Sequence, residues 1–316
     1  MYKYKSAMKE LRSFFMLVKC FLVNIFPENT LPDFVGERVL KISNRKVNND
    51  KKEFPKIIWM YWETDNLPCY VKKIIEHVIS KNPDFVVNLL NNDSVKEYLP
   101  DLKVIGEMPI ANKTDLIRLN LLYNYGGIWI DSTTIFNEDL SWVIQLNAKE
   151  SFDIIGYYKE TSTIDFKYPV IESWFLASRS GNKLIELWLK ALSPLAILGA
   201  KKYFELLKSR SDYLAIKQNI NRPEYLLVYL AQQIALREYE LFNLFLKKSE
   251  DSAFLLQESR GWKNYEINYA LCRAPMKNPH IPIVKLTSGD RLLIEKFYKY
   301  NLIRRKSILG LVCVDK

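Results

Sequence analysis

The sequence has few of the residues from which disulfide frameworks and zinc sites are built. Its 316 residues include four cysteines and two histidines. The cysteines lie far apart and form no Cys-x-x-Cys pair: they are Cys20, Cys69, Cys272 and Cys313. This spacing argues against a thiolate zinc site and against a fold held by disulfides, and it fits a reducing compartment.

Long apolar runs are also missing. The most apolar stretch near the start, residues 13–26, is broken by Lys19 and is shorter than the ~20 residues that a helix needs to cross a bilayer. Basic residues precede this stretch and no small-residue cleavage site follows it, so it does not look like a signal peptide. As a helix, it would lie at a membrane interface or pack against the core.

The chain carries a net charge of +10, but this charge is absent from its middle. Residues 1–56 contribute +6 and residues 291–316 contribute +5, whereas the region between them contributes −1. No nucleic-acid-binding motif accompanies the basic ends, so we expect no nucleic-acid partner. The ends would suit an anionic membrane surface, which would place the protein in the cytoplasm, peripheral on the inner face of the cell membrane. The alternative is a pair of solvated tails.

Strand and helix patterns alternate along the first half of the chain. Apolar runs bounded by turn residues predict strands, and apolar residues at a helical spacing predict helices. The predicted order is a strand at 56–62, a helix at 68–80, a strand at 84–90, a helix at 113–125 and a strand at 127–131. Such alternation is typical of an α/β fold with a mostly parallel central sheet.

The second half of the chain mixes the two patterns. We expect strands at 152–158, 170–177 and 254–257. Residues 181–250 are predicted to form a helical insertion or subdomain, whose last helix would run over 223–248. The polar residues 43–53 predict a linker, and a final helix is expected at about 290–300.

The predicted strand at 127–131 ends on a lone carboxylate, Asp131. Ligands of parallel α/β sheets bind beyond the carboxyl ends of the strands, so this strand would deliver Asp131 to a cleft. On the helix before it, Asp115 and Arg118 lie three residues apart and share one face. Carboxylates accept hydrogen bonds from sugar hydroxyls and Arg pairs with phosphate, so the three residues suit a sugar nucleotide. The alternative is a structural ion pair beside an aspartate in a turn.

The spacing of these residues resembles that of a known family. The pattern Ala-x-x-Thr-Asp-x-x-Arg at 111–118, followed by Gly126, Gly127 and then Asp131, is similar to the signature of glycosyltransferase family 32. That group includes the yeast mannosyltransferases that initiate the outer chain, bacterial capsular polysaccharide synthesis proteins and, more distantly, the large clostridial glucosylating toxins.

Three further segments extend the resemblance. Pro-Lys-Ile-Ile-Trp at 55–59 resembles the first strand of the family, and the segments at 172–175 and 285–287 look most like its capsular branch. The resemblance implies a GT-A-type nucleotide-sugar-binding domain. The implied layout is a basic, partly apolar helical segment with a linker at 1–53, the GT-A catalytic domain at 54–290, and a basic C-terminal helix and tail at 291–316.

The resemblance also implies a function. The family transfers sugars with retention of the anomeric configuration, so the donor would be a nucleotide sugar, with a UDP-sugar favoured and a GDP-sugar open. The acceptor would be a glycan or a lipid-linked oligosaccharide in capsular or surface polysaccharide synthesis. The alternative is a non-catalytic nucleotide-sugar-binding or scaffold subunit of an assembly complex.

Matching positions imply roles for individual residues. Trp59 would stack on the nucleotide base. From the sequence alone, Tyr61 and Trp62 are predicted as core residues of the strand, with lining of the base pocket as the alternative for Tyr61. Asp115 and Arg118 would hold the donor sugar. Asp131 would contact the ribose and a divalent cation, either Mn²⁺ or Mg²⁺. The resemblance therefore assigns the catalytic role to the two aspartates and the arginine.

Thr133 stands where the family has the second acid of its metal-binding motif. Mn²⁺ and Mg²⁺ prefer carboxylate oxygens, so the loss of one acid weakens such a site. Asp131 would then hold the ion with the diphosphate and water, with His280 as a further candidate ligand, or the ion is dispensable. The hydroxyls of Ser132 and Thr133 would contact phosphate or the ion.

Five other positions have a functional and a plain interpretation. Lys285 would meet the diphosphate or be a solvated lysine, and Glu172 would face the acceptor or the reacting sugar or only flank a strand. Trp262 would belong to a flexible acceptor loop or to a plain turn. Gly126 and Gly127 turn the chain, and their lack of side chains would leave room for the donor.

Overall fold

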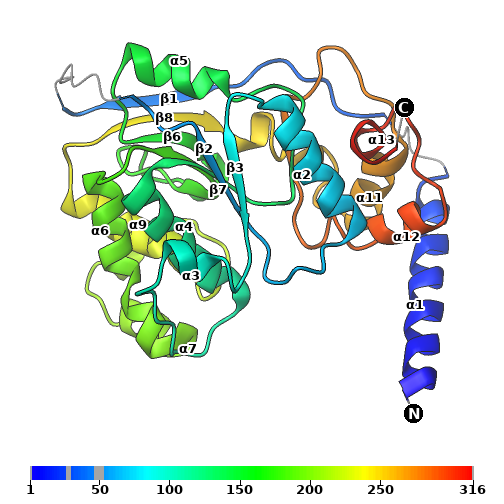
Figure 1. The fold of residues 1–316 in the computed structure, drawn as a ribbon, viewed down its shortest axis with the longest axis horizontal. Helices are drawn as coiled ribbons and strands as arrows, with labels where there is room; N and C mark the ends of the chain where they lie inside the picture. The colour runs from blue at the N-terminus through cyan, green and yellow to red at the C-terminus, as the bar shows by residue number, and fades with distance from the viewer. Residues whose placement is uncertain (1, 26–29, 46–52, 315–316) are drawn as a thin grey trace.

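A seven-stranded sheet forms the centre of the protein (Figure 1). The structure is a computed structural model and describes residues 2–25, 30–45 and 53–314. The strands follow the order β1-β8-β6-β7-β4-β2-β3. Their bounds are β1 (Val39–Ser43), β2 (Ile57–Tyr61), β3 (Val86–Leu90), β4 (Gly127–Ile130), β6 (Ile154–Tyr158), β7 (Ile171–Ser178) and β8 (Asn243–Lys248).

Most strands of this sheet run in the same direction. β2 is parallel to both β3 and β4, and β6 is parallel to β8. Only β7 and β1 run against their neighbours. The predicted α/β fold with a mostly parallel central sheet is therefore confirmed. A separate two-stranded sheet pairs β5 (Thr134–Phe136) with β9 (Ile283–Lys285).

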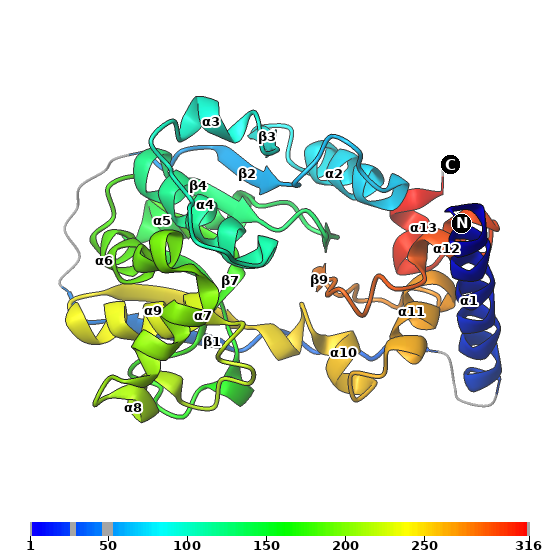
Figure 2. The ribbon, with the colours of Figure 1, turned by 90° about the horizontal axis from the view of Figure 1, so that it is seen from below.

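Helices cover both faces of the sheet (Figure 2). Successive residues of a strand point to opposite faces, so Trp59 and Trp129 lie in one core while Ile58 and Ile128 lie in the other. The first core is closed by α4, α6 and α9, and the second by α2 and α5. The helices are α1 (Tyr2–Val23), α2 (Cys69–Lys81), α3 (Val95–Tyr98), α4 (Ile110–Tyr125), α5 (Ser141–Lys149), α6 (Lys183–Leu192), α7 (Pro194–Lys208), α8 (Tyr213–Lys217), α9 (Leu227–Glu238), α10 (Leu255–Ser259), α11 (Asn264–Arg273), α12 (Ile294–Lys299) and α13 (Ile308–Cys313).

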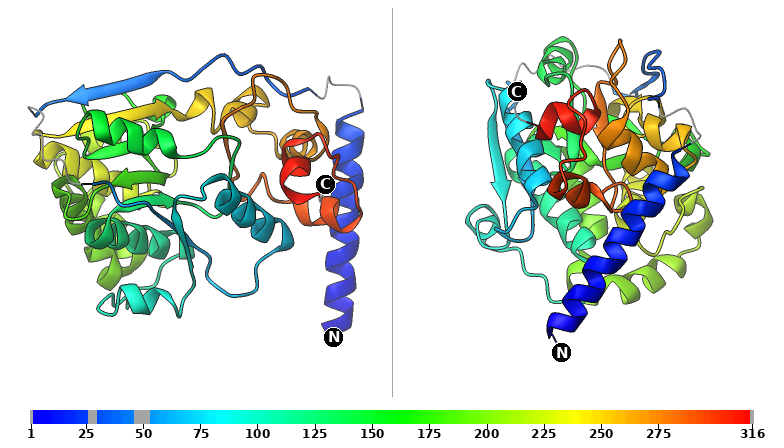
Figure 3. Two further views of the ribbon diagram at one scale, coloured as in Figure 1. Left: turned by 45° about the horizontal axis from the view of Figure 1, so that its top comes forward. Right: turned by 90° about the vertical axis from the view of Figure 1, so that its right-hand side faces the viewer.

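Helices α1, α11, α12 and α13 gather at one end of the molecule (Figure 3). α1 lies along α11 and α12, where Leu17 and Cys20 are buried and Phe21 stacks on Phe297 with 5.6 Å between ring centroids. One face of the apolar N-terminal segment therefore packs against the core, which is one of its two predicted environments. None of the helices in the described residues is long and apolar enough to cross a membrane.

The N-terminal boundary expected at residue 54 is wrong. β1 lies inside the expected N-terminal segment, yet it pairs with β8 and forms an edge of the central sheet. Of the predicted linker at 43–53, residues 46–52 lie outside the described residues. The helices predicted within residues 181–250 are present as α6 to α9, and α6 and α9 form part of the layer that covers the sheet.

Two predicted elements near residue 250 are wrong as well. The helix expected over 223–248 ends at Glu238, and residues 243–248 form β8 instead. Hydrogen bonding to β1 and β6 on both sides overrides the helical propensity of this Leu- and Lys-rich stretch. The strand expected at 254–257 is the start of α10, a short helix.

Candidate active site

Asp131 follows β4 directly, at the edge of the sheet where the carboxyl ends of β2, β3 and β4 meet. Its backbone N–H donates to the carbonyl oxygen of Trp174 on β7 at 2.9 Å, and Trp129 Nε1 donates to Asp131 Oδ1 at 3.1 Å. The side chain of Asp131 is 27% exposed, although the residues of β4 are buried. The strand therefore delivers this carboxylate to the open edge of the sheet.

Arg118 joins the two aspartates of the predicted site. Its guanidinium forms an ion pair with Asp115 on the same helix, and its Nη2 lies 2.9 Å from Asp131 Oδ1. It also lies over the Trp129 ring, 4.9 Å from the ring centroid. The Arg118 side chain is only 4% exposed, so its buried charge needs a partner, and the two aspartates provide carboxylate oxygens on two sides of the guanidinium.

Burial and neighbouring charges shift the two carboxyl groups in opposite directions. Burial raises the pKa of Asp115 to about 6, although Arg118 opposes this shift. Burial also acts to raise the pKa of Asp131, but Lys285 and Arg118 outweigh it, so this pKa lies below its usual value. Both carboxyl groups are therefore mostly charged at neutral pH, and Asp131 keeps its charge to a lower pH than Asp115 does.

Lys285, the last residue of β9, completes the cluster. Its Nζ lies 3.1 Å from Asp131 Oδ2 and donates to Thr133 Oγ1 at 3.2 Å. The β5–β9 register places it there, because Lys285 is opposite Thr134. Burial lowers the pKa of Lys285, and Asp131 partly offsets the effect. A solvated lysine, one of the two interpretations of the sequence, is wrong because the side chain is 10% exposed.

Glu172 lies within β7 and is buried. The hydroxyl of Tyr229 on α9 donates to Glu172 Oε2, and Ser249 Oγ lies 3.5 Å from Oε1. Burial raises the pKa of Glu172, and the charge of Lys159, followed by smaller contributions from Tyr229 and Lys285, opposes this shift. The residue therefore lies behind the charged cluster, where its side chain is not open to an acceptor; the predicted acceptor contact has no support in this conformation.

Trp59 lies in the core and not at the rim of the site. Its side chain is 1% exposed, and its Nε1 donates to the carbonyl oxygen of Gly126 at 2.8 Å. Tyr98 and Tyr125 pack against the indole at centroid distances of 5.1 and 5.6 Å. No face of the ring is open to a base in this conformation, so base stacking on Trp59 stays a prediction without structural support.

Gly126 and Gly127 lie at the amino end of β4, whereas Asp131 follows its carboxyl end. Their φ angles of +68° and +95° confirm the predicted turn. A Cβ at Gly126 would lie 2.6 Å from the backbone nitrogen of Ser180, and one at Gly127 would lie 2.5 Å from the carbonyl oxygen of Ile57. The expectation that these glycines leave room for the donor is wrong, because protein backbone fills that space.

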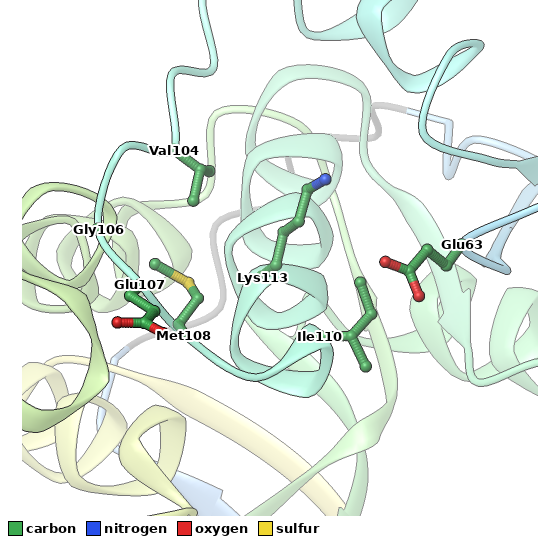
Figure 4. Close-up of a pocket in the computed structure, with 7 residues that line it drawn as sticks. All are labelled: Glu63, Val104, Gly106, Glu107, Met108, Ile110 and Lys113. Atoms are coloured by element: carbon green, nitrogen blue, oxygen red, sulfur yellow. The ribbon is translucent and has the colours of Figure 1, made fainter.

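A pocket of about 310 Å³ opens beside the first turn of α4 (Figure 4). It is lined by the loop after β2, the segment before α4 and α4 itself: Glu63, Val104, Gly106, Glu107, Met108, Ile110 and Lys113. Asn92 Oδ1 accepts hydrogen bonds from Lys113 Nζ at 2.6 Å and from the Tyr61 hydroxyl at 2.8 Å. Ser132 Oγ donates to the carbonyl oxygen of Tyr61 at 2.8 Å. A chain of contacts therefore runs from the pocket to the neighbour of Asp131.

His280 lies beyond the far end of the β5–β9 pair. β9 runs from Ile283 to Lys285, and His280 precedes its first residue, whereas Lys285 beside Asp131 is its last residue. His280 Nδ1 instead contacts the carbonyl oxygen of Lys277 at 2.6 Å. The structure gives no contact between His280 and Asp131, so their pairing on one ion stays a prediction. Within residues 2–25, 30–45 and 53–314, no three His, Cys, Asp or Glu side chains are grouped so that they could hold a metal.

Trp262 lies in a turn and is 39% exposed. Gly261 and Trp262 both have positive φ angles, of 54° and 59°. The indole Nε1 donates to Glu258 Oε1 at 3.1 Å, and Lys159 Nζ lies over the ring at 5.0 Å from its centroid. The structure thus shows the turn, and the acceptor role of Trp262 stays a prediction.

Three residues near the cluster were given no functional role from the sequence: Trp62, which was predicted as a core residue, Tyr229 and Arg291. Trp62 directly follows β2, and the Arg291 guanidinium lies 6.0 Å from the centroid of its ring. Arg291 is also close enough to contribute to the lowered pKa of Lys285, behind the larger effect of burial. The position of Trp62 just past a strand end was a usable signal. No local pattern marks the other two, because their positions depend on how α9 and the C-terminal region pack.

Residues 28–223, more than half of the chain, match the family of capsular polysaccharide synthesis proteins. The protein belongs to this family. The predicted resemblance to the capsular branch is thereby confirmed. The matched range contains Asp115, Arg118 and Asp131 and ends before Lys285.

Similar regions occur in fungal glycosyltransferases. The chain is 28% identical to the O-glycosyltransferase braB of Annulohypoxylon truncatum over 164 residues, which are 44% of this chain and 37% of that protein. It is 24% identical to the putative glycosyltransferase HOC1 of Saccharomyces cerevisiae over 149 residues, 42% of this chain and 38% of that protein. It is 26% identical to inositol phosphoceramide mannosyltransferase 3 of Schizosaccharomyces pombe over 107 residues, 32% of this chain and 30% of that protein.

The matches therefore span only 30–38% of the length of these relatives. The solved structure of the PaToxG glycosyltransferase covers 96% of this chain and 98% of its own, at 16% identity and a TM-score of 0.35. That score is too low to show a shared fold. The sheet topology and the family match therefore carry the fold assignment, and they are consistent with a GT-A-type domain.

Proposed function

We propose that the protein is a retaining glycosyltransferase. It would move a sugar from a nucleotide-sugar donor, with a UDP-sugar favoured over a GDP-sugar, to a glycan or lipid-linked acceptor in capsular or surface polysaccharide synthesis. The family and the glycosyltransferase relatives support sugar transfer in general. The observation that carries the proposal is the ion-paired cluster of Asp115, Arg118 and Asp131 at the carboxyl edge of the sheet, with Asp131 partly open.

The cluster offers partners for the sugar and for the diphosphate of such a donor. The partly exposed Asp131 carboxylate can accept hydrogen bonds from sugar hydroxyls, and Asp115 holds the Arg118 guanidinium beside it. Lys285 and Arg291 add positive charge beside Asp131, which suits a diphosphate. Both signs of charge therefore meet at one edge of the sheet, as a sugar nucleotide requires.

The pocket beside α4 suits the nucleoside part. Its volume of about 310 Å³ is at the lower end of the range of ligand pockets, which fits a base with its ribose better than a whole sugar nucleotide. Met108 and Ile110 give it apolar walls, and Glu63 and Lys113 offer hydrogen-bonding groups (Figure 4). In this proposal the base binds in the pocket and does not stack on Trp59, the residue to which the resemblance gives that role.

Incubation with a panel of UDP- and GDP-sugars tests the proposed function. We expect slow release of nucleotide from one donor without acceptor, detected by chromatography. NMR of the transferred sugar should show the anomeric configuration of the donor. Binding of a donor without hydrolysis or transfer would instead favour the non-catalytic subunit.

Trp59→Phe is expected to lower stability without weakening nucleotide binding by the folded protein. The phenyl ring fills most of the indole site but cannot donate to the Gly126 carbonyl oxygen, and a buried group left unpaired costs ~1–3 kcal/mol. Trp188→Phe is the matched control, because Trp188 Nε1 donates to the Val228 carbonyl oxygen at 2.8 Å in the same core. Chemical denaturation and calorimetric titration with UDP measure both effects. Weaker binding by Trp59→Phe alone would support base stacking.

We further propose that the protein associates peripherally with the inner face of the cell membrane. A stripe of exposed apolar side chains, the α1 stripe, runs along α1: Leu11, Phe14, Phe15, Val18 and Leu22. The fold brings α1 and α12, which belong to the two basic ends of the chain, to the same end of the molecule (Figure 3). Apolar side chains flanked by basic charge are typical of helices that lie in the surface of an anionic membrane.

The double substitution Phe14→Ser and Phe15→Ser is expected to reduce flotation with anionic liposomes by about tenfold or more, since burial of each ring contributes ~1.5–3 kcal/mol. Both rings are exposed, so the melting temperature should not change. Ile197→Ser with Leu214→Ser is the matched control, because these exposed apolar residues lie on α7 and α8. A wild-type protein that stays soluble beside anionic liposomes at low salt would contradict the membrane proposal.

A further inference from the structure

The ammonium group of Lys285 contacts both residues that correspond to the acids of the family's metal-binding motif, Asp131 and Thr133. Its Nζ is 3.1 Å from Asp131 Oδ2, at the motif's first acid. It also donates at 3.2 Å to the hydroxyl of Thr133, which stands in the place of the second acid. A positive charge of the chain itself is therefore present where the resemblance implies a divalent cation.

The oxygens around Lys285 do not fit a divalent cation. Mg²⁺ is held by several oxygens at ~2.0–2.1 Å in octahedral geometry. Here Asp131 Oδ1 accepts from Arg118, and Oδ2 faces Lys285. Thr133 Oγ1 gives its hydrogen to the Leu286 carbonyl oxygen at 3.0 Å and accepts from Lys285. Each oxygen already faces a donor, and the two cationic donors would repel an ion placed between them.

Other ligands are not available to complete a metal site. Asp115 is turned to Arg118 in an ion pair. His280 lies beyond the other end of β9, held to Lys277. Over the part of the chain that the structure describes, no cluster of three metal-ligating side chains exists.

We propose that Lys285 takes the place of the divalent cation, so that the protein binds the diphosphate of its donor and transfers the sugar without a metal ion. This inference rests on the proposed transferase function and adds the source of the positive charge. Arg291 supplies a second cationic side chain at the same edge, where it lies over the Trp62 ring.

Lys285 is held firmly enough for this role. Its backbone N–H donates to the Ala253 carbonyl oxygen at 3.0 Å, and its own carbonyl oxygen accepts from Gln257 Nε2 at 2.8 Å. Its Nζ also donates to the Leu286 carbonyl oxygen at 3.1 Å. A charge that is already oriented needs no reorganisation when the donor binds or reacts.

An ammonium group can do the electrostatic part of the cation's work. During transfer, the bond between the anomeric carbon and the diphosphate oxygen breaks, and its electron pair stays on that oxygen. The acceptor oxygen bonds to the anomeric carbon and releases its proton to water. The new negative charge appears on the diphosphate beside Lys285, which forms and breaks no covalent bond and stabilises that charge.

Calorimetric titration of the wild-type protein with UDP and with GDP, in excess EDTA and again with Mn²⁺, tests the proposal. We expect one nucleotide to bind with the same Kd under both conditions. Binding that appears only with Mn²⁺ would overturn the metal-free inference and leave the transferase proposal standing. If neither nucleotide binds under either condition, the result contradicts both the proposed transferase function and the metal-free inference that rests on it.

Lys285→Met supplies a second test, which compares the Kd for UDP with the Kd for uridine. If Lys285 only supported the fold, its replacement would raise both values equally. The Kd for UDP should rise by about tenfold to a hundredfold, because a hydrogen bond to a charged group is lost, while the Kd for uridine stays unchanged. Lys190→Met, at an exposed lysine on α6, is the matched control and should change neither value. An equal loss for UDP and uridine would assign Lys285 to the support of the fold and overturn the proposal.

A conversion variant completes the test. Lys285→Ala combined with Thr133→Asp removes the ammonium and restores the second acid, so UDP binding should become dependent on Mn²⁺. Electron paramagnetic resonance then reports bound Mn²⁺ directly, and circular dichroism confirms the fold. UDP binding by this folded variant that remains strong in EDTA would contradict the substitution of lysine for metal.

Discussion

Asp131→Asn is expected to lower sugar transfer by about 100- to 1,000-fold, because a charged partner of the reacting donor is lost from a preorganised site. The amide keeps the shape of the side chain and can still accept from Arg118, but it no longer balances Arg118 and Lys285. Turnover of the donor identified in the panel, measured with purified protein of known melting temperature, gives the result.

Asp212→Asn is the control for this experiment. Asp212 pairs with Arg210 on the surface, where both side chains are about 40% exposed, so its replacement should change neither turnover nor stability by a measurable amount. Near-wild-type turnover by a folded Asp131→Asn protein would contradict the assignment of Asp131 to the active site.

Arg118→Met is expected to cost ~3–5 kcal/mol of unfolding free energy, the usual penalty for leaving a buried charge without its partner. Asp115 would then be a buried carboxylate without a cation. Urea denaturation followed by tryptophan fluorescence measures the loss. Arg210→Met, which breaks an exposed pair, should stay within ~0.5 kcal/mol of the wild type.

The loss of unfolding free energy caused by Arg118→Met should be smaller at lower pH. The pKa of Asp115 is already raised to about 6, and removal of Arg118 raises it further. An acid with a raised pKa in the folded state holds a proton that the unfolded chain has released, so stability increases as the pH falls through this window. The difference in unfolding free energy between Arg118→Met and the wild type should therefore be smaller at pH 5 than at pH 8. Asp115→Asn added to Arg118→Met should recover part of the loss at pH 8, and equal differences at both pH values would contradict the buried pair.

The central part of the fold could be predicted because its signals are local. β2 is an uninterrupted apolar run, α2 has apolar residues on one face, and α4 ends at Gly126 with the positive φ that glycine favours. The strand–helix alternation then fixes parallel neighbours, which leads directly to Asp131 at the carboxyl edge. These elements need only short-range information.

The elements that were missed depend on partners that are distant in the sequence. β8 has a helical composition but lies between β1 and β6, and this pairing decides its conformation. Trp59 illustrates the same limit, because an aromatic residue on a predicted strand can point into the core or towards a ligand. Only the packing of Tyr98 and Tyr125 around it shows that it points into the core. Lys285 reaches the site through the pairing of β9 with β5, which no local pattern reveals.

The pairing of β1 with β8 also sets the order in which the protein can fold. Val39 lies opposite Lys247, about 200 residues later in the chain, so this contact carries a large entropy of loop closure. At a synthesis rate of ~5–20 residues per second, β1 waits ~10–40 s on the ribosome for its partner strand. Lys41, in the middle of β1, places a charge on this unpaired strand and discourages association with other chains. Synthesis that stalls before residue 243 would leave β1 exposed, and such fragments are the ones we expect to require a chaperone.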